Sequence, residues 1–382
     1  MKVLHTADWH LGKIIHGKSL IEDQKYFIDN CFLKAISSEN PDIVIIAGDI
    51  YDRAIAPIEA ISLFNYVINT LYENNITVLC ISGNHDSPKR IATYSDILNK
   101  NNIFFRSDIS GCFNPITISK NNQKINFFLL PYFDLVNAKL YFNSYDDLQD
   151  QITSIDIAYK IIIDKIYEKL NKDELNVLIS HCFITGSSIS DSENPLFVGN
   201  SCEVGSEKFS IFDYVALGHL HSYQKNKLNM CYSGSPLNYS FNEPNSQKSM
   251  NIINFKNKHD ISIKQIPIKP LREMLSVEGY FEDLINSGKL NPNDNYIRII
   301  LKDNNPVFMP LYRLREFYPN ILTLSSNLLT ESEDIKPSHY NALSNEQDIF
   351  KSFMQDICSY KVNEDDLTFF NKALKKSYKE IP

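Results

Sequence analysis

The first part of the chain alternates between short apolar runs and longer segments whose apolar residues recur at helical spacing. Apolar runs at Lys2–Thr6, Ile43–Ile46 and Thr77–Ser82 predict strands that are buried on both faces. Between them, Ser19–Ser37 and Pro57–Glu73 show the spacing of helices with one apolar face. Strands separated by helices in this way predict an α/β layer structure.

The middle of the chain predicts further strands and one long helix. Apolar runs at Ile125–Phe133, Leu175–Ser180 and Phe212–Leu217 favour strands, the first of them in a second sheet. Ser144–Leu170 favours a long, partly amphipathic helix. After Pro270 the pattern changes to strand, helix, strand, helix, strand, which is enough for a small α+β domain.

These changes in pattern divide the chain into four expected parts. They are an α/β domain over 1–268, a small α+β domain over 269–330, a polar linker over 331–345 and a helical tail over 346–382. In the tail we expect helices at about 346–358 and 364–377, each with an apolar stripe. The residues of the two stripes are Phe350, Phe353, Met354 and Ile357, and Leu367, Phe370 and Leu374. The stripes could cover the chain's own core, but the polar stretch before them favours a partner-binding helix pair.

Polar side chains gather where the predicted strands end. In an α/β sheet, ligands collect beyond the carboxyl ends of the strands, so these side chains are expected to meet. A single histidine at such a place is usually structural, whereas a whole set at successive strand ends is not. The D-x-H and H-x-H spacings also put alternate side chains on one face of an extended chain. The ligand-type members of the set are Asp8, His10, Asp49, Asn84, His181, His219 and His221.

The chemistry of this set predicts a metal centre. Carboxylates, an amide and imidazoles without a thiolate suit Mn²⁺, Fe²⁺ or Zn²⁺. Seven ligands are too many for one ion and fit two ions that share a carboxylate. Such pairs lie about 3.5–4 Å apart and hold the attacking and leaving oxygens of a phosphoryl displacement. Bound cations would also explain how a protein of net charge −8 attracts a phosphodiester.

Composition narrows the class of protein further. The hydrophobic content of 43% is ordinary for a globular chain of 382 residues, and no apolar stretch approaches the roughly 18–20 residues of a membrane span. Seven scattered cysteines without a CxxC pair predict reduced thiols in a cytoplasmic protein. Without a Walker-type phosphate loop, the chain is not expected to bind ATP itself.

The order of the polar motifs resembles that of the calcineurin-like metallophosphoesterase superfamily. The chain reads D-x-H, G-D-x-x-D, G-N-H-D, a lone histidine after a strand and G-H-x-H. The flanking stretches "HTADWHLGKIIHGKSLIEDQ" and "YSGSPLNYSFNE" resemble the SbcD-type exonuclease subunits within it, the bacterial counterparts of the meiotic-recombination double-strand-break nuclease. The resemblance spans residues 5–243. It implies a four-layer α/β/β/α sandwich with a small α+β capping domain and C-terminal helices.

The resemblance also implies a role for each site residue. One ion would be held by Asp8, His10, Asp49 and His221, and the second by Asp49, Asn84, His181 and His219. Asp49 would bridge the two ions, and His85 would be the catalytic histidine that contacts the phosphate and helps the 3′ oxygen leave. Asp86 would orient its turn. Residues expected near the metals or the DNA are Asp52, Arg53, Ser87 and Arg90, with Lys13, Lys18 and Lys89 as weaker candidates.

The function implied is a metal-dependent DNA nuclease, with Mn²⁺ as the expected metal. It would act 3′ to 5′ on duplex ends and cut single strands and hairpins, in DNA end processing, replication and recombination repair. Its partners would be DNA, a second copy of the chain and an SbcC-type SMC-like ABC ATPase. The second copy would bind at the helix Pro57–Glu73, and the ATPase at the C-terminal helices. Two alternatives stay open: a phosphodiesterase or phosphatase that does not cut DNA, and a catalytically silent scaffold for the ATPase.

Overall fold

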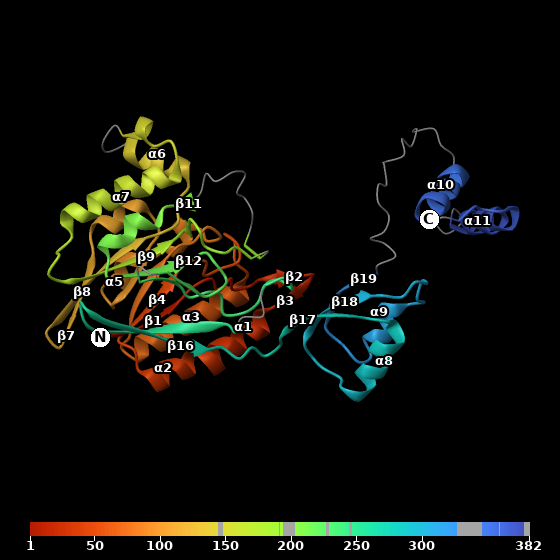
Figure 1. Cartoon of the computed structure of the whole chain (residues 1–382), viewed down its shortest axis with the longest axis horizontal. Helices are drawn as coiled ribbons and strands as arrows, with labels where there is room; N and C mark the ends of the chain where they lie inside the picture. The colour runs from red at the N-terminus through yellow and green to blue at the C-terminus, as the bar shows by residue number, and fades with distance from the viewer. Residues whose placement is uncertain are drawn as a thin grey trace.

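Two stacked β-sheets form the centre of the molecule (Figure 1). The computed structural model describes residues 1–143, 148–190, 192–193, 203–226, 229–243, 247–326, 346–358 and 360–377. Within these ranges each central sheet has six strands. The first sheet runs in the order β16 (Asp260–Pro267), β15 (Ser249–Asn257), β1 (Lys2–Thr6), β4 (Ile43–Ala47), β5 (Thr77–Ile81) and β6 (Ile103–Arg106).

The second sheet lies against the first and is also mixed. Its central strands β8, β9, β12 and β14 are parallel to one another, and the edge strands β7 and β13 are antiparallel to their neighbours. Its order is β13 (Gln224–Lys225), β14 (Met230–Tyr232), β12 (Tyr214–Gly218), β9 (Leu175–His181), β8 (Gln123–Leu130) and β7 (Ile116–Lys120).

Side chains on alternate positions of the strands build separate layers of core. In β4, Ile43 and Ile45 join the core between the two sheets, while Val44 and Ile46 join the core beneath the outer helices. The helices over the first sheet are α1 (Ile21–Phe27), the π-helical turn Ile28–Phe32, α2 (Leu33–Glu39) and α3 (Ile58–Glu73). Those over the second are α6 (Leu135–Asn143) and α7 (Ile155–Lys169). This confirms the four-layer sandwich.

A smaller domain follows the sandwich and has its own apolar core. Within the continuous range 247–326 it consists of β17 (Met274–Gly279), α8 (Phe281–Leu290), β18 (Tyr296–Leu301), α9 (Pro310–Leu314) and β19 (Ile321–Ser326). We call this unit the cap. Its three strands are parallel, so the cap is an α/β unit where the sequence led us to expect α+β.

Two helices at the end of the chain pack against each other. They are α10 (Glu346–Cys358) and α11 (Glu364–Ser377), joined by Phe350 stacked on Phe370 with ring centroids 4.2 Å apart. Their bounds agree with the sequence expectation, and the expected linker at 331–345 lies outside the described residues. Among the described helices, none combines the length and the apolar character needed to cross a membrane.

The long helix expected over Ser144–Leu170 is shorter in the structure. Residues 144–147 lie outside the described residues, and Gln149–Gln151 form a separate 3-10 turn. The helix α7 begins at Ile155, where the Ser154 hydroxyl accepts a hydrogen bond from the Ile157 amide at 3.2 Å. Ser154 therefore caps the helix and sets its start.

Candidate metal centre

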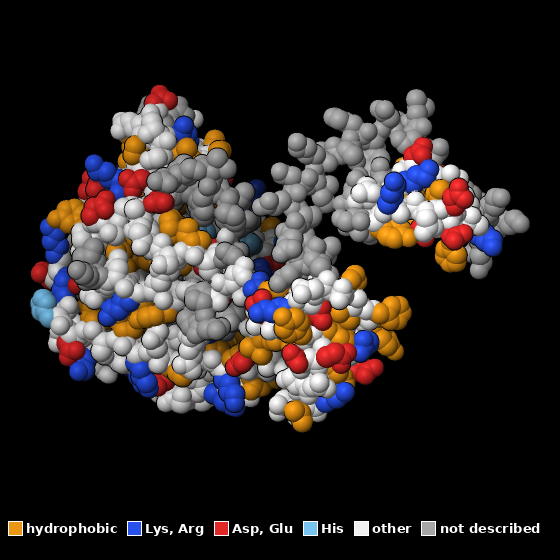
Figure 2. Space-filling view, turned by 45° about the vertical axis from the view of Figure 1, so that its right-hand side comes forward, with side chains coloured by type: hydrophobic (Ala, Val, Ile, Leu, Met, Phe, Trp, Pro, Cys, Tyr) orange, Lys and Arg blue, Asp and Glu red, His pale blue; other side chains and the backbone are white. Residues whose placement is uncertain are grey.

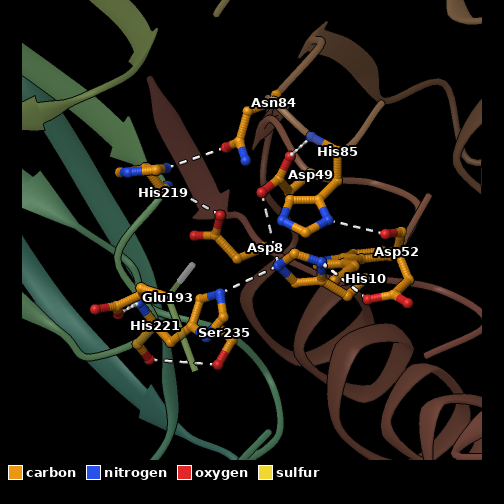
Figure 3. Close-up of polar contacts among 12 residues, drawn as sticks. Asp8, His10, Asp49, Asp52, Asn84, His85, Glu193, His219, His221 and Ser235 are labelled. Carbon is orange, nitrogen blue, oxygen red and sulfur yellow. Dashed lines mark hydrogen bonds and ion pairs between the residues drawn. The ribbon is translucent and has the colours of Figure 1, made fainter. Parts of the chain in front are cut away.

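The polar loops of both sheets meet at one edge of the sandwich (Figure 3). The strands β1, β4 and β5 run parallel in one sheet, and β9 and β12 run parallel in the other, and the polar residues follow their carboxyl ends. Several of these residues have left-handed backbone, with φ of 55° at Asp8, 44° at His10, 50° at Asp49 and 102° at His219. Such conformations cost free energy in residues other than glycine and gather at functional sites.

Three of the expected ligands form a first group. One candidate donor atom each from Asp8, His10 and His221 lie within 4.8 Å of one another, and the three residues are at most 3% exposed. The Nε2 atoms of His10 and His221 are 3.1 Å apart. The Asp8 carboxylate accepts the His219 amide at 2.9 Å through Oδ1, while its Oδ2 has no hydrogen-bond partner among the described residues.

A second group lies next to the first. Donor atoms of Asp8, Asp49 and His181 also lie within 4.8 Å of one another. The Asn84 carbonyl oxygen is 2.9 Å from His181 Nε2 and 3.1 Å from His219 Nδ1. Asn84 and His219 are half-buried, and histidine atoms are visible in a recess of the surface in Figure 2. This group can therefore be reached from solvent.

Asp8 belongs to both groups, and Asp49, a member of the second, also reaches a histidine of the first. Its Oδ2 is 3.6 Å from His10 Nε2 and 3.4 Å from His181 Nε2. Its other oxygen, Oδ1, accepts the His85 amide at 2.9 Å. A carboxylate that reaches one histidine of each group has the position that a bridging ligand needs.

His85 is not one of the seven predicted donors, but its ring forms a third group with His10 and Asp52, whose candidate donor atoms also lie within 4.8 Å of one another. Its Nδ1 is 2.8 Å from the Asp52 carbonyl, so Nδ1 donates its proton there and Nε2 lies on the opposite side of the ring (Figure 3). Its ring centroid is 4.7 Å from that of His10. Asp52 itself pairs with Lys13 at 2.7 Å and lies 3.6 Å from His10 Nδ1. Asp52 thus contacts both histidines, one through its side chain and one through its backbone.

Burial keeps most of the imidazoles in the neutral form that a metal requires. It lowers the pKa of His10, and it lowers the pKa of His219 and of His221 to about 3. His181 differs: burial opposes its protonation, but Asp49 outweighs this effect and raises the pKa to about 9. A cation bound beside Asp49 would instead favour the neutral imidazole of His181, the form that a metal ligand needs.

The carboxylates show the opposite effects of burial and of partners. Burial raises the pKa of Asp8. For Asp49, burial acts in the same direction, but the nearby His181 holds the pKa well below its usual range. Burial and the charge of Asp49 raise the pKa of Asp86 to about 6. The Asp86 carboxylate accepts the amides of Ile50, Tyr51 and Gly83 at 2.9–3.1 Å, so it connects the Asp49 loop to the Gly83 turn.

The donor set fits divalent cations. It offers hard carboxylate and amide oxygens together with neutral imidazoles, and the neighbouring Cys182 thiol instead contacts the Ser180 hydroxyl. The unpartnered Asp8 oxygen, and the two imidazole nitrogens of His10 and His221 that face each other, are what a shared cation would satisfy. Glycine lets the loops approach this closely, because a Cβ on Gly83 would lie 2.1 Å from Asp49 Oδ1.

Several residues that hold the donors in place were missed from sequence. The Gln24 amide donates to the carbonyls of Trp9 at 3.2 Å and His10 at 2.7 Å. Glu193 accepts the His221 amide, and Lys248 donates to the His221 carbonyl at 2.8 Å. Lys248 also forms a buried ion pair with Glu243. Gln24 and Glu243 lie inside stretches that carried the family resemblance, which was the available signal.

The residues expected near DNA lie farther out. Arg53, Lys89 and Arg90 are exposed, while Ser87 and Lys18 are half-buried. Arg90 and Ser87 line a groove between α3 and the short helices α4 (Pro88–Ile91) and α5 (Ser95–Asn99). Their roles stay predictions.

Comparisons with known proteins place the chain in a family. Residues 1–223 match the model of the calcineurin-like phosphoesterases. The chain is 35% identical over 368 residues to the SbcD subunit of the nuclease SbcCD from Staphylococcus epidermidis, covering 95% of each protein. Among solved structures, a family 1 β-glucosidase from Thermotoga maritima aligns with 81% of this chain and 79% of its own at 12% identity and a TM-score of 0.21. An endoglucanase from a rumen ciliate aligns with 79% of this chain and 76% of its own at 9% identity and a TM-score of 0.17. Scores this low do not indicate a shared fold.

The model match covers most of the sandwich, including the carboxyl ends of β1, β4, β5, β9 and β12, and the alignment with the staphylococcal protein extends through the cap. The chain belongs to the calcineurin-like phosphoesterases and, among them, to the SbcD family of nuclease subunits.

Proposed function

We propose that this protein is the metal-dependent nuclease subunit of an SbcCD-type complex and hydrolyses DNA phosphodiesters. The observation that carries the proposal is that the Asp49 carboxylate approaches both His10, in one group of donors, and His181, in the other, since a shared carboxylate is what a two-metal phosphoesterase requires. The alignment with a staphylococcal SbcD protein over 95% of the chain supports it. We extend the proposal to 3′ to 5′ cleavage of duplex ends and to cleavage of single strands and hairpins.

In this proposal the seven donors hold two cations. Asp8, His10, Asp49 and His221 would hold one, and Asp49, Asn84, His181 and His219 the other. When bound, such ions ionise water near neutral pH and stabilise negative charge on phosphoryl oxygens. Manganese is our choice of metal, because mixed carboxylate and imidazole sites without thiolate suit it, although Fe²⁺ and Zn²⁺ accept the same ligands.

His85 acts on the leaving group in this proposal. The hydrogen bond from Nδ1 to the Asp52 carbonyl fixes the orientation of the ring, so Nε2, on the opposite side, can contact a substrate. A protonated Nε2 can stabilise a phosphate oxygen or give its proton to the departing 3′ oxygen. Because His85 is half-buried beside the donors, it can reach a phosphate without occupying a ligand position.

The C-terminal helix pair is proposed to bind the ATPase partner. Phe350 and Phe370 of the two predicted stripes stack on each other, while Phe353 of the first stripe is 50% exposed. Two apolar residues outside the stripes, Ile349 and Phe369, are 44% and 78% exposed. Helices with exposed apolar side chains commonly lie in a groove or against a coiled coil of another protein.

The cysteines bear on the proposed compartment. Among the described residues, the free thiols are Cys31, Cys80, Cys112, Cys182 and Cys231, and they fit the expected reducing cytoplasm.

The helix α3 is proposed to meet a second copy of the chain. Its outer face exposes Ile58, Ile61, Tyr66 and Tyr72, each more than 40%. Beside it lies the groove toward α4 and α5, with a volume of about 850 Å³ and a largely apolar lining. Apolar patches of this kind on one helix commonly mark protein interfaces. A homodimer within a heterotetramer would cover this face.

One experiment separates the proposal from its alternatives. Purified protein with Mn²⁺ is incubated with a labelled DNA hairpin and, separately, with bis-p-nitrophenyl phosphate. We expect cleavage of both. Cleavage of the small ester alone would favour a phosphodiesterase that does not cut DNA, and cleavage of neither, without bound metal, would favour a silent scaffold.

A matched variant tests the role of His85. His85→Gln should keep the metal content of the wild type and lose cleavage by a factor of about 10²–10⁴, the usual contribution of a positioned acid or base. The control is Lys100→Gln, an exposed residue directly after α5 that has no proposed role, and it should cleave as the wild type does. If His85→Gln still turns over normally, the proposed role is wrong.

A further inference from the structure

The cap meets the sandwich through one face of its central strand. In β18, Ile297, Ile299 and Leu301 point into the core of the cap. Side chains alternate along a strand, so the residues between them lie on the other face. Tyr296 and Arg298 occupy that face, and both contact residues of the sandwich.

The first of these contacts is centred on Asp23 in α1. Its Oδ2 accepts the Tyr296 hydroxyl at 2.6 Å and the Arg272 guanidinium at 3.1 Å. Arg272 also pairs with Glu22 at 3.0 Å and with Asp294 at 3.1 Å. Asp23 is only 2% exposed. A buried carboxylate bound by two cap residues fixes the cap to α1, and removing a partner would leave it poorly paired.

The next residue along the helix holds the metal loop. Gln24 is fully buried, and its side chain binds three backbone groups: the carbonyls of Trp9 and His10 and, at 2.9 Å, the Gly12 amide. Asp8 and His10 in this loop have left-handed backbone. A strained loop keeps its shape only where its surroundings hold it, and Gln24 supplies three of the hydrogen bonds that do so.

The second contact repeats the arrangement. The Arg298 guanidinium lies over the Phe241 ring at 5.4 Å from its centroid, and the exposed His16 packs on the same ring at 6.1 Å. Two residues before Phe241, the Tyr239 hydroxyl donates to the Trp9 carbonyl at 2.6 Å. Both cap contacts therefore end on segments that also hold the backbone of the metal loop.

Beside the Asp23 contact the seam between cap and sandwich is hollow. A cavity of about 510 Å³ separates cap from sandwich there, and its lining includes Asp23, Leu237, Lys248, Arg272 and Tyr296. Close packing across the seam is therefore incomplete: Met274 and Leu322 of the cap pack on the apolar core of the sandwich, and the polar and aromatic contacts add to this seating.

We propose that Asp23 and Gln24 are a coupled pair of positioning residues: Asp23 receives the cap, Gln24 holds the His10 loop, and the seating of the cap thereby sets the affinity of the metal centre. This inference rests on the proposed function of that centre. It adds that anything that moves the cap, such as bound DNA, changes how tightly the His10 side of the centre holds its ion. Because coupling of two sites is reciprocal, metal binding also favours the seated cap.

The test measures metal affinity with a substrate too small to need the cap. In the full-length protein, the Mn²⁺ concentration for half-maximal hydrolysis of bis-p-nitrophenyl phosphate is compared between variants. Arg272→Met should raise it about threefold to tenfold, within the range typical of residues that act on ligands indirectly. Tyr296→Phe, which removes one oxygen atom, should shift it in the same direction by less, and Gln24→Met should give the largest shift.

The control is Arg315→Met, an exposed arginine at the end of α9, which should match the wild type. Thermal unfolding checks that each variant is folded. If Arg272→Met does not fold, the smaller change Tyr296→Phe still tests the coupling. If both cap variants retain the wild-type Mn²⁺ dependence while losing DNA cleavage, the cap serves DNA alone and the coupling is refuted.

The same data separate this inference from the proposed function. A wild type that hydrolyses the ester but not DNA would refute the nuclease proposal, while the coupling would still be read from the ester. If neither substrate is cleaved, Mn²⁺ titration by calorimetry replaces the kinetic readout, and an unchanged dissociation constant in Arg272→Met again refutes the coupling.

Discussion

The metal edge of the sandwich and the C-terminal helix pair depart from ordinary protein surfaces in opposite ways. At the metal edge, charged and polar side chains are buried: Asp8, His10 and Asp49 are 0%, 1% and 2% exposed. In the helix pair, large apolar side chains face solvent, with Phe353 at 50% and Phe369 at 78%. Burying charge and exposing apolar surface both cost free energy, so each region is favourable only with a ligand bound.

The difference teaches which ligand each region needs. Buried carboxylates beside neutral imidazoles call for cations, since a cation restores the charge balance lost on leaving water. Exposed apolar stripes call for another protein, since only burial of those side chains recovers the hydrophobic free energy. The two regions should therefore fail separately, and the predictions below test this from the largest effect to the smallest.

The largest effect is expected at the bridging carboxylate. Asp49→Asn should lower cleavage by about a thousandfold or more, because losing several kcal/mol of charge stabilisation corresponds to that factor. The control is Asp52→Asn, a neighbouring carboxylate that keeps its backbone bond to His85 and should lose about tenfold. The measurements are kcat on the small ester and bound manganese by elemental analysis. Full manganese content in Asp49→Asn would contradict the bridging role.

Removing the helix pair should abolish partner binding and spare the chemistry. Without residues 345–382, the protein should no longer co-purify with the ATPase, yet still cleave single strands and the small ester with Mn²⁺. Phe353→Asp should weaken co-purification in the full chain. Phe308→Asp is its control, because that cap residue is 79% exposed but lies outside the helix pair. Unchanged co-purification after truncation would refute the assignment.

Metal removal should destabilise the sandwich independently of the tail. One ion present at a hundred times its dissociation constant adds about 2.7 kcal/mol to the free energy of unfolding. Chelation should therefore lower the melting temperature by several degrees, and Mn²⁺ should restore it. Differential scanning calorimetry of the full and the truncated chain should give the same shift in melting temperature. A shift that depends on the tail would contradict the independence of the metal centre and the helix pair.

The smallest expected effect is on the free energy of unfolding, from an ion pair outside both regions. It serves as a reference for the larger effects above. Asp156, at the start of α7, pairs with Lys208 at 2.7 Å and accepts the Gly205 amide at 2.8 Å. Burial opposes ionisation, but the Lys208 ammonium and the Gly205 amide together outweigh it and lower the pKa of Asp156. A lowered pKa in the folded state means that the stabilisation is present above the unfolded value and is lost as pH falls through the folded one.

Asp156→Asn should therefore be less stable than the wild type near neutral pH by about 0.2–1 kcal/mol, as for exposed pairs. The difference should disappear in strong acid. Urea denaturation across pH measures it, and a difference that grows in acid would contradict the assigned pairing. Added salt should shrink it.

Local patterns in the sequence were sufficient for the sheets and for the positions of the donors. The strand at Ile43–Ala47 was predicted to within a residue, because a β-branched run between helices has few other interpretations. The donors could be found because parallel strands bring their carboxyl ends together, so Asp49 and Asn84 had to be neighbours once the strands were placed.

What the sequence did not reveal depends on contacts between distant segments. Nothing near Lys248 in the chain indicates that it is buried beneath the His221 loop, or that Gln24 binds the backbone of His10. The parallel order of the cap strands agrees with their alternation with α8 and α9, the same pattern that predicts α/β structure in the first domain, so the α+β expectation overlooked a signal that the sequence contained. The start of α7 was missed because residues before Ser154 carry apolar side chains at a spacing that a helix would also show.

The alternation in β18 has a consequence for how this protein can change over evolution. The six residues of β18 serve two surfaces: the odd-numbered residues face the core of the cap, and the even-numbered residues lie on the face toward the sandwich. A one-residue insertion ahead of Tyr296 would turn the isoleucines toward α1 and force an arginine among apolar neighbours. We therefore expect relatives to vary the residues of this strand but to keep its length, and to accept insertions in the loop at 302–309 that follows it.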